Sequence, residues 1–209
     1  MAINTNRWNR MRYTLFTPIY DLIASFGPQR RRSIAVLDPQ PGESILIVGA
    51  GTGADLPYLP PSARVIAGDI TPSMVERIRR RAAALGRHVE ARVMDGHALD
   101  LPDQSVDAVI LHLVLAVIPD PAAATREVAR VLKPGGRAVV FDKFVADDAV
   151  VSGGRRALNL LTNLIFSDIT RKLGPLLEGT GLIITHREPA MLRGAFQIIL
   201  LEKTRQPSV

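Results

Sequence analysis

Short apolar runs alternate with helical patterns over the middle of the chain. The clearest run is Ile45–Val48, whose mostly β-branched residues predict a strand buried on both faces. Thr71 followed by Pro72 predicts the start of a helix that ends at Gly86. Further strands are expected at 65–69, 89–94, 106–112 and 137–142, and a further helix at 122–132.

The C-terminal third departs from this alternation. Residues 155–178 are rich in leucine and isoleucine and predict helices, whereas Ile183–Glu188 and Phe196–Glu202 predict two strands joined by a loop. Strands that alternate with helices are typical of a doubly wound parallel sheet, and a terminal strand pair adds an antiparallel strand. We therefore predict an α/β fold with a Rossmann-like, doubly wound seven-stranded sheet, mostly parallel with an antiparallel C-terminal strand.

The N-terminal segment has apolar residues at helical spacing. They are Trp8, Met11, Leu15, Ile19, Leu22 and Phe26. Pro18 is expected to break this stripe, so we predict N-terminal capping helices within residues 1–38. The net charge of the chain is +6, and residues 1–32 contribute most of it through six arginines against one aspartate.

Two interpretations of this basic segment stay open. Its arginines are solvated on helices that cover the sheet, or they form a face that binds an anionic membrane surface through residues 5–32. The residues expected to face lipid in the second case are Trp8, Arg7, Arg10 and Arg12.

Composition narrows the range of chemistry. The chain has 209 residues and no cysteine, so disulfides and cysteine nucleophiles are excluded and one domain is expected. Its four histidines are scattered, and no metal site is predicted. No stretch approaches about 20 apolar residues and no signal peptide is evident, so we expect a cytoplasmic protein, with peripheral contact with the inner membrane face as an open alternative.

A glycine-rich turn directly follows the first predicted strand. It consists of Gly49, Ala50, Gly51, Thr52 and Gly53. Glycine permits the backbone angles and the close ligand approach that a strand-to-helix turn requires. Asp69 ends the next strand, where a carboxylate can accept hydrogen bonds from two ribose hydroxyls. Because these features also fit a dinucleotide fingerprint, they leave two classes of cofactor open.

Other candidate residues end neighbouring strands. Asp95 follows the third strand, where it can accept a hydrogen bond from an adenine amino group, and His112 and Asp142 end the fourth and fifth strands. The carboxyl ends of parallel strands meet at one edge of a sheet, where doubly wound proteins bind ligands. We expect these residues to lie along that edge with the glycine turn.

Five motifs in this order resemble the class I S-adenosylmethionine-dependent methyltransferases. They are Gly49–Gly53, Asp69–Met74, Met94–Gly96, Leu101–Asp107 and Arg130–Gly136. The resemblance covers about residues 40–145 as a cofactor-binding core, with 146–209 as lid helices and a terminal strand pair. It implies an enzyme that uses S-adenosylmethionine and releases S-adenosylhomocysteine.

The resemblance also implies roles for the motif residues. The glycine turn would meet the methionine part of the cofactor, Asp69 the ribose and Asp95 the adenine. The remaining expected cofactor neighbours are Ile70, Met94 and Gly96. Ile47 departs from the family, whose members often have an acid two residues before the first glycine. Any contribution of that acid near the cofactor's amino group must come from elsewhere, or binding is weaker.

Softer motifs resemble the short bacterial phosphatidylethanolamine N-methyltransferases and their quinone C-methyltransferase relatives. They are Tyr13 and Tyr20-Asp21, Phe26–Pro28 followed by arginines, and Leu115–Pro121. This similarity implies methylation of the phosphatidylethanolamine headgroup, with Tyr20 over the methionine end of the cofactor. The amine must lose a proton to attack, and His112 is the candidate acceptor, with Tyr20, Asp142 and Lys143 as further substrate-side groups.

Several alternatives remain at this point. A methyltransferase for a quinone-type or soluble small molecule shares every cofactor motif. A nicotinamide-dependent oxidoreductase is disfavoured because no tyrosine has a lysine four residues later. Nucleic-acid methylation is disfavoured because His112–Leu115 stands where an Asn/Asp-Pro-Pro-aromatic motif would follow the fourth strand. A binding module without activity would require a vestigial glycine turn.

Overall fold

The computed structural model describes residues 5–6, 26–145 and 170–205. The predictions for Arg7, Trp8, Arg10, Arg12 and Tyr20 lie outside the described residues. The same is true of the helices predicted at 155–178, except for the part from residue 170 onward.

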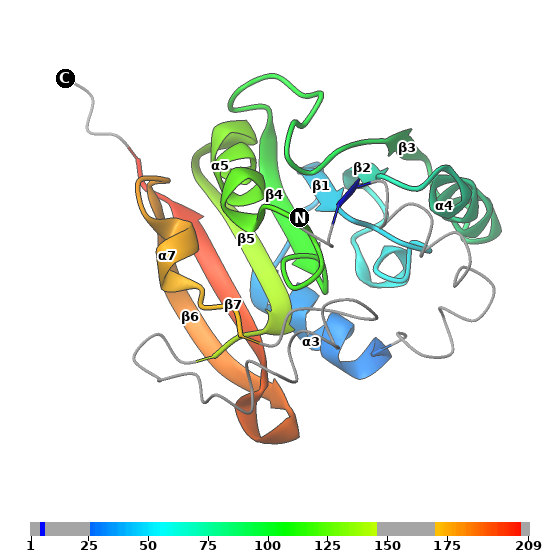
Figure 1. Cartoon of the computed structure of the whole chain (residues 1–209). Helices are drawn as coiled ribbons and strands as arrows, with labels where there is room; N and C mark the ends of the chain where they lie inside the picture. The colour runs from blue at the N-terminus through cyan, green and yellow to red at the C-terminus, as the bar shows by residue number, and fades with distance from the viewer. Residues whose placement is uncertain (1–4, 7–25, 146–169, 206–209) are drawn as a thin grey trace.

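A seven-stranded mixed sheet forms the centre of the molecule, in the order β3-β2-β1-β4-β5-β7-β6. Figure 1 shows β6 and β7 at one end of the sheet and α4 beside β3 at the other. The strands are β1 (Ser44–Val48), β2 (Arg64–Asp69), β3 (Val89–Val93), β4 (Val106–His112), β5 (Leu132–Lys143), β6 (Leu182–Met191) and β7 (Phe196–Lys203).

The strand directions agree with the sequence prediction. β1 to β5 are mutually parallel, and β1 lies in the middle, with Ile47 opposite Ala67 of β2 and Ile110 of β4. β7 inserts antiparallel between β5 and β6. The buried β-branched runs therefore form the interior strands, and the prediction of a doubly wound, mostly parallel sheet with an antiparallel C-terminal strand is confirmed by β7.

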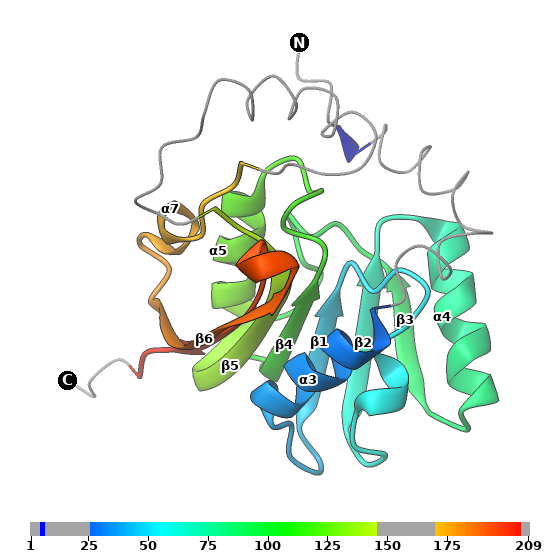
Figure 2. The same cartoon turned by 90° about the horizontal axis from the view of Figure 1, so that it is seen from below.

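Two hydrophobic layers cover the two faces of the sheet, as Figure 2 shows with α3 in front of the strands and α5 behind them. Ile34 and Leu37 of α3 (Gly27–Leu37) pack in one layer with Ile78 of α4 (Pro72–Ala84). Val128 of α5 (Pro121–Val131) packs in the other layer. The short elements are the 3₁₀ turns η1 (Leu56–Tyr58) and η2 (Leu192–Gly194) and the helix α7 (Gly174–Leu177).

The start of β5 differs from the prediction. The sequence predicts a turn at 133–136 and a strand from Arg137, whereas β5 already begins at Leu132. Val106 of β4 pairs with Leu132 and Ala108 pairs with Arg137, so residues 133–136 bulge out of the ladder. Gly135 has a φ of +75° in this bulge, a conformation that glycine adopts without a steric cost.

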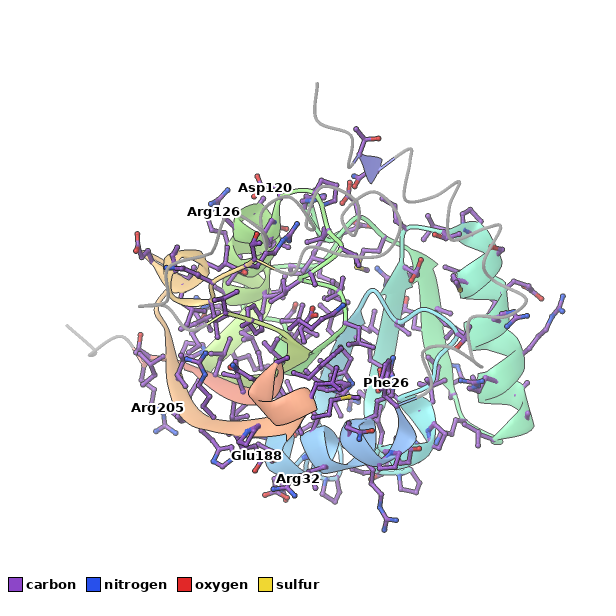
Figure 3. All side chains as sticks on the ribbon, turned by 60° about the horizontal axis from the view of Figure 1, so that its bottom comes forward. Phe26, Arg32, Asp120, Arg126, Glu188 and Arg205 are labelled. Atoms are coloured by element: carbon purple, nitrogen blue, oxygen red, sulfur yellow. The ribbon has the colours of Figure 1, made fainter. Side chains whose placement is uncertain are left out.

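Helix α3 is held against the sheet by aromatic packing and an ion pair. Phe26 lies 6.0 Å from Phe141 of β5 and 5.9 Å from Phe196 of β7, measured between ring centroids. At the surface, Arg32 donates to Glu188 of β6, with 2.9 Å between Nη2 and Oε2 (Figure 3). Among the described residues no helix has the length and apolar character needed to cross a membrane.

The first prediction concerns the core. Phe141 is fully buried and contacts both neighbouring phenylalanine rings, so Phe141→Ala leaves a cavity that rigid strands cannot close. We expect the free energy of unfolding to fall by about 3–5 kcal/mol in urea denaturation. Leu192→Ala serves as the control because that side chain is 67% exposed. Equal effects of the two substitutions would contradict the assignment of Phe141 to the core.

Candidate functional site

A pocket lies at the carboxyl edge of the parallel strands, where the sequence predicts a cofactor. Its walls come from the glycine turn, the ends of β2 and β3, the start of α4 and the loop after β4. The lining residues are Asn6, Val48, Gly49, Gly51, Asp69, Ile70, Met74, Met94, Asp95, Gly96, Leu113, Val114, Val117, Ile118 and Pro119.

The glycine turn brings backbone up to the facing wall. Gly49, Gly51 and Gly53 have φ values of +64°, +56° and +76°. A Cβ on Gly49 would lie 2.6 Å from Cγ2 of Val114, so only glycine lets the turn and the loop after β4 approach this closely. Gly96 is similar, since its Cβ would lie 2.9 Å from Ile118.

Asp69 faces the turn from the end of β2. Its carboxylate accepts hydrogen bonds from the backbone N–H of Gly51 at 2.9 Å and of Thr71 at 2.8 Å. Burial raises the pKa of Asp69, and these two N–H donors partly oppose the shift. An oxygen that accepts one N–H keeps a second lone pair, so the carboxylate can still accept ribose hydroxyls.

Asp95 lies at the other end of the pocket and is held from two sides. Asn6 Nδ2 donates to one oxygen at 2.6 Å, and the Nδ1 of His97 lies 2.7 Å from the other. The backbone N–H of Asp120 donates to Nε2 of the same imidazole, which places the ring proton on Nδ1. Neither Asn6 nor His97 is among the sequence candidates, since neither follows a strand or belongs to a recognised motif.

The loop after β4 forms the apolar wall and is anchored from β5 and from residue 171. Asp142 accepts from the N–H of Ala116 at 2.9 Å, and burial raises the pKa of this carboxyl. Arg171 donates to the carbonyl oxygens of Leu115 and Ile118. Leu113 has a φ of +60°, so a non-glycine residue is held in the left-handed region at the start of this wall.

His112 lies behind this wall in a buried polar cluster. Its Nδ1 is 2.7 Å from Oδ1 of Asp55, and its Nε2 is 2.8 Å from Oγ of Ser33. Arg30 donates to both oxygens of Asp55, at 2.9 and 2.8 Å. Both ring nitrogens of His112 are therefore engaged within the protein.

The position of Arg30 corrects one expectation. Arg30 is expected from the sequence to be either solvated or facing lipid, like the other arginines of residues 1–32. It is neither, because it is only 4% exposed. Arg30 shares the inward face of α3 with Ser33, Ile34 and Leu37, at helical spacing. That spacing is the signal in the sequence that could have identified it.

Some of the predicted site residues line the pocket and others lie outside it. Those in the lining are Gly49, Gly51, Asp69, Ile70, Met94, Asp95 and Gly96. Those outside the lining are Ala50, Thr52, Gly53, His112, Asp142 and Lys143.

Lys143 places its ammonium 5.2 Å from the ring centroid of Phe196, and burial lowers the pKa of this lysine.

Comparisons with known proteins agree on the kind of enzyme. The family described as methyltransferase domain matches residues 46–140. A phosphatidylethanolamine N-methyltransferase of Cereibacter sphaeroides is 33% identical over 70% of this chain and 74% of its own length. The chain belongs to the S-adenosylmethionine-dependent methyltransferases. A demethylmenaquinone methyltransferase of Thermus thermophilus is 32% identical over 80% of this chain and 77% of its own.

A structural comparison supports the same fold. A chain from the complex between the Haloferax volcanii Trm112 methyltransferase activator and a methyltransferase superposes with a TM-score of 0.77. It covers 96% of this chain and 99% of its own, at 16% sequence identity. At that identity the likeness concerns the fold alone, and it extends over the antiparallel end of the sheet.

The cofactor of this enzyme is S-adenosylmethionine, and the residues present fit it. The missing side chains of Gly49 and Gly96 let the backbone of the polar side of the pocket pack directly against the apolar side chains of Val114 and Ile118. Asp69 and Asp95 are acceptors for hydroxyl and amino donors, and their negative charge suits a cationic sulfonium. Ile47 is 1% exposed within the core, so it offers no polar group toward the cofactor's amino end.

The close approach of the glycine turn yields the second prediction. Gly49→Ala forces a Cβ against Val114 and displaces one wall, so we expect S-adenosylhomocysteine binding to weaken by about tenfold or more in calorimetry, which corresponds to about 1.4 kcal/mol. Gly86→Ala is the matched control, because Gly86 has a φ of +62° but no atom within 4 Å of its Cβ. Equal losses of affinity in both variants would show that backbone strain alone is responsible.

A third prediction separates two roles for His112. His112→Asn keeps an N–H that can donate to Asp55 but removes the imidazole as a proton acceptor. Because both ring nitrogens are engaged, we expect kcat for methyl transfer to fall by less than about tenfold. Loss of a general base costs on the order of 10²–10⁴-fold. A loss in that range would support the catalytic role predicted from the sequence.

Proposed function

We propose that the protein transfers the methyl group of S-adenosylmethionine to the amine of the phosphatidylethanolamine headgroup at a membrane surface. The observation that carries this proposal is the 33% identity to the Cereibacter sphaeroides phosphatidylethanolamine N-methyltransferase over most of both chains. The cofactor supplies an electrophilic methyl group on sulfur, and the protein aligns the acceptor and excludes water.

The described part of the pocket supports a reaction that depends mainly on positioning. The titratable side chains in its described lining are two carboxylates, Asp69 and Asp95, and both already accept hydrogen bonds. Neither imidazole nor amine lines this part of the pocket. We infer that the headgroup loses its proton to water or to a substrate-side group such as Tyr20 before the amine attacks.

Basic residues before the sheet support the membrane part of the proposal. Residues 1–32 contain six arginines, and of the three in α3 only Arg30 is buried, while Arg31 and Arg32 are exposed. Each basic residue near an anionic membrane surface contributes about 1 kcal/mol of attraction. Trp8, Arg7, Arg10 and Arg12 are the remaining residues proposed to face lipid.

A quinone-type acceptor is the second candidate. It is favoured by the similarity to the Thermus thermophilus demethylmenaquinone methyltransferase, which extends over 177 residues. Both candidate functions use the same cofactor site, so only an assay of which acceptor becomes methylated distinguishes them.

The fourth prediction tests the acceptor directly. With radiolabelled S-adenosylmethionine and vesicles containing phosphatidylethanolamine, we expect label in the lipid fraction, and more of it when anionic lipid is added. Parallel vesicles carry demethylmenaquinone in place of phosphatidylethanolamine. Asp69→Ala should abolish transfer in either case, because it removes the proposed ribose acceptor.

Each outcome of this assay distinguishes the candidates. If only the quinone becomes labelled, the acceptor is a quinone and the proposal of phosphatidylethanolamine is wrong. No label in either lipid, with S-adenosylhomocysteine binding intact, would reject both lipid acceptors in favour of a soluble small molecule. An equal rate with and without anionic lipid would contradict the proposed membrane contact.

A further inference from the structure

The buried cluster behind the pocket joins three elements that are distant in the sequence. Arg30 comes from α3, Asp55 follows the glycine turn and His112 ends β4. The side chains of these residues are 5%, 2% and 1% exposed. None of them lines the pocket, so the cofactor site as described leaves the cluster without a role.

The charge of Asp55 is stabilised by Arg30 and His112 together. Burial by itself raises the pKa of Asp55, but His112 and Arg30 outweigh burial and hold that pKa far below its usual range. Asp55 is therefore a carboxylate, and the Nδ1 of His112 must carry the proton that it donates to Asp55. Removing Arg30 would deprive the buried Asp55 carboxylate of its counter-charge, which is strongly unfavourable.

The cluster also lies directly behind both walls of the pocket. The backbone runs from Gly53 to Asp55 within one turn, because the N–H of Leu56 donates to the carbonyl of Gly53 at 3.1 Å. His112 directly precedes Leu113, whose N–H donates to the carbonyl of Phe141 at 2.8 Å. The bond between Asp55 and His112 therefore links the end of the glycine turn to the start of the apolar wall.

We propose that Asp55 is a positioning residue for the cofactor, which sets the distance between the glycine turn and Val114 through its bonds to Arg30 and His112. A shift of either wall changes the close contact with Val114 that the missing side chain of Gly49 allows. The inference rests on the cofactor occupying this pocket, as in the proposed function, but it is independent of which acceptor is methylated.

The fifth prediction uses Asp55→Asn, which keeps the side-chain shape but removes the charge. We expect S-adenosylhomocysteine to bind about tenfold more weakly or worse in calorimetry, and the melting temperature to fall, because the buried ion pair with Arg30 is lost. A change in affinity of less than about threefold would overturn the proposal. Tenfold corresponds to about 1.4 kcal/mol of binding free energy.

A double variant separates positioning from stability. Arg30→Met with Asp55→Asn removes both charges, and replacing a buried ion pair by neutral groups often restores stability. We expect the melting temperature to recover toward that of the unmodified protein while the affinity stays low. Recovery of both quantities would show that the cluster is merely structural and would overturn the proposal.

Two controls complete the design. Glu188→Gln removes the negative charge from the exposed ion pair between Arg32 of α3 and β6 and should leave the affinity unchanged. Asp69→Ala should lose binding if the cofactor occupies this pocket. If Asp69→Ala binds normally, the placement of the cofactor is wrong; if it fails to bind while Asp55→Asn binds normally, only the positioning role of Asp55 is wrong.

Discussion

The arrangement around the pocket depends on the contacts of the buried Asp55 carboxylate with Arg30 and His112. An ionised carboxylate with 2% exposure is tolerable only if its hydrogen bonds and its counter-charge are all supplied by the protein. Arg30 and His112 supply them, and they come from α3 and β4. The first described helix, the end of the glycine turn and the tip of a central strand therefore have one mutual arrangement that satisfies the charge.

The sheet explains why this arrangement forms a site. The parallel strands β1, β2 and β3 lie side by side, and their carboxyl ends bring the glycine turn, Asp69 and Asp95, in that order, to one edge of the sheet. On the other side of β1, β4 leads into a loop that is anchored by Asp142 of β5 and by Arg171. The side of the pocket that meets the cofactor is therefore polar and acidic, which suits a cationic cofactor. The opposite wall is apolar, which helps to exclude water while the methyl group is transferred.

Much of the fold is encoded in local patterns that sequence analysis can detect. β-Branched runs mark the interior strands, and Asp69 and Asp95 are recognisable because Asp69 ends a predicted strand and Asp95 directly follows one. Arg30 is different, because it stands in a run of three arginines that looks uniformly solvated. Its helical spacing with Ser33, Ile34 and Leu37 is the one local signal that sets it apart, and the packing of α3 on β5 and β7 makes it a core residue and leaves its neighbours exposed.

The pocket walls were also only partly predictable. The loop after β4 is recognisable as a motif, but its path depends on a left-handed Leu113 and on contacts with Asp142 and Arg171 that are distant in sequence. Asn6 meets Asp95 only in three dimensions, whereas His97 contacts it within a local turn two residues later in the chain. No periodicity encodes the contacts of Asn6, Asp142 and Arg171, because they arise after the sheet has brought its strand ends together.

The most direct measurement is a crystal structure of the protein with S-adenosylhomocysteine bound. We predict that the ribose hydroxyls lie within hydrogen-bond distance of Asp69 and the adenine amino group within that distance of Asp95. The homocysteine end should lie against Gly49 and Gly51, with Asp55 still bound to Arg30 and His112. A ligand seated away from the glycine turn, or bound there with the Asp55 cluster broken, would contradict the view that this cluster shapes the cofactor site.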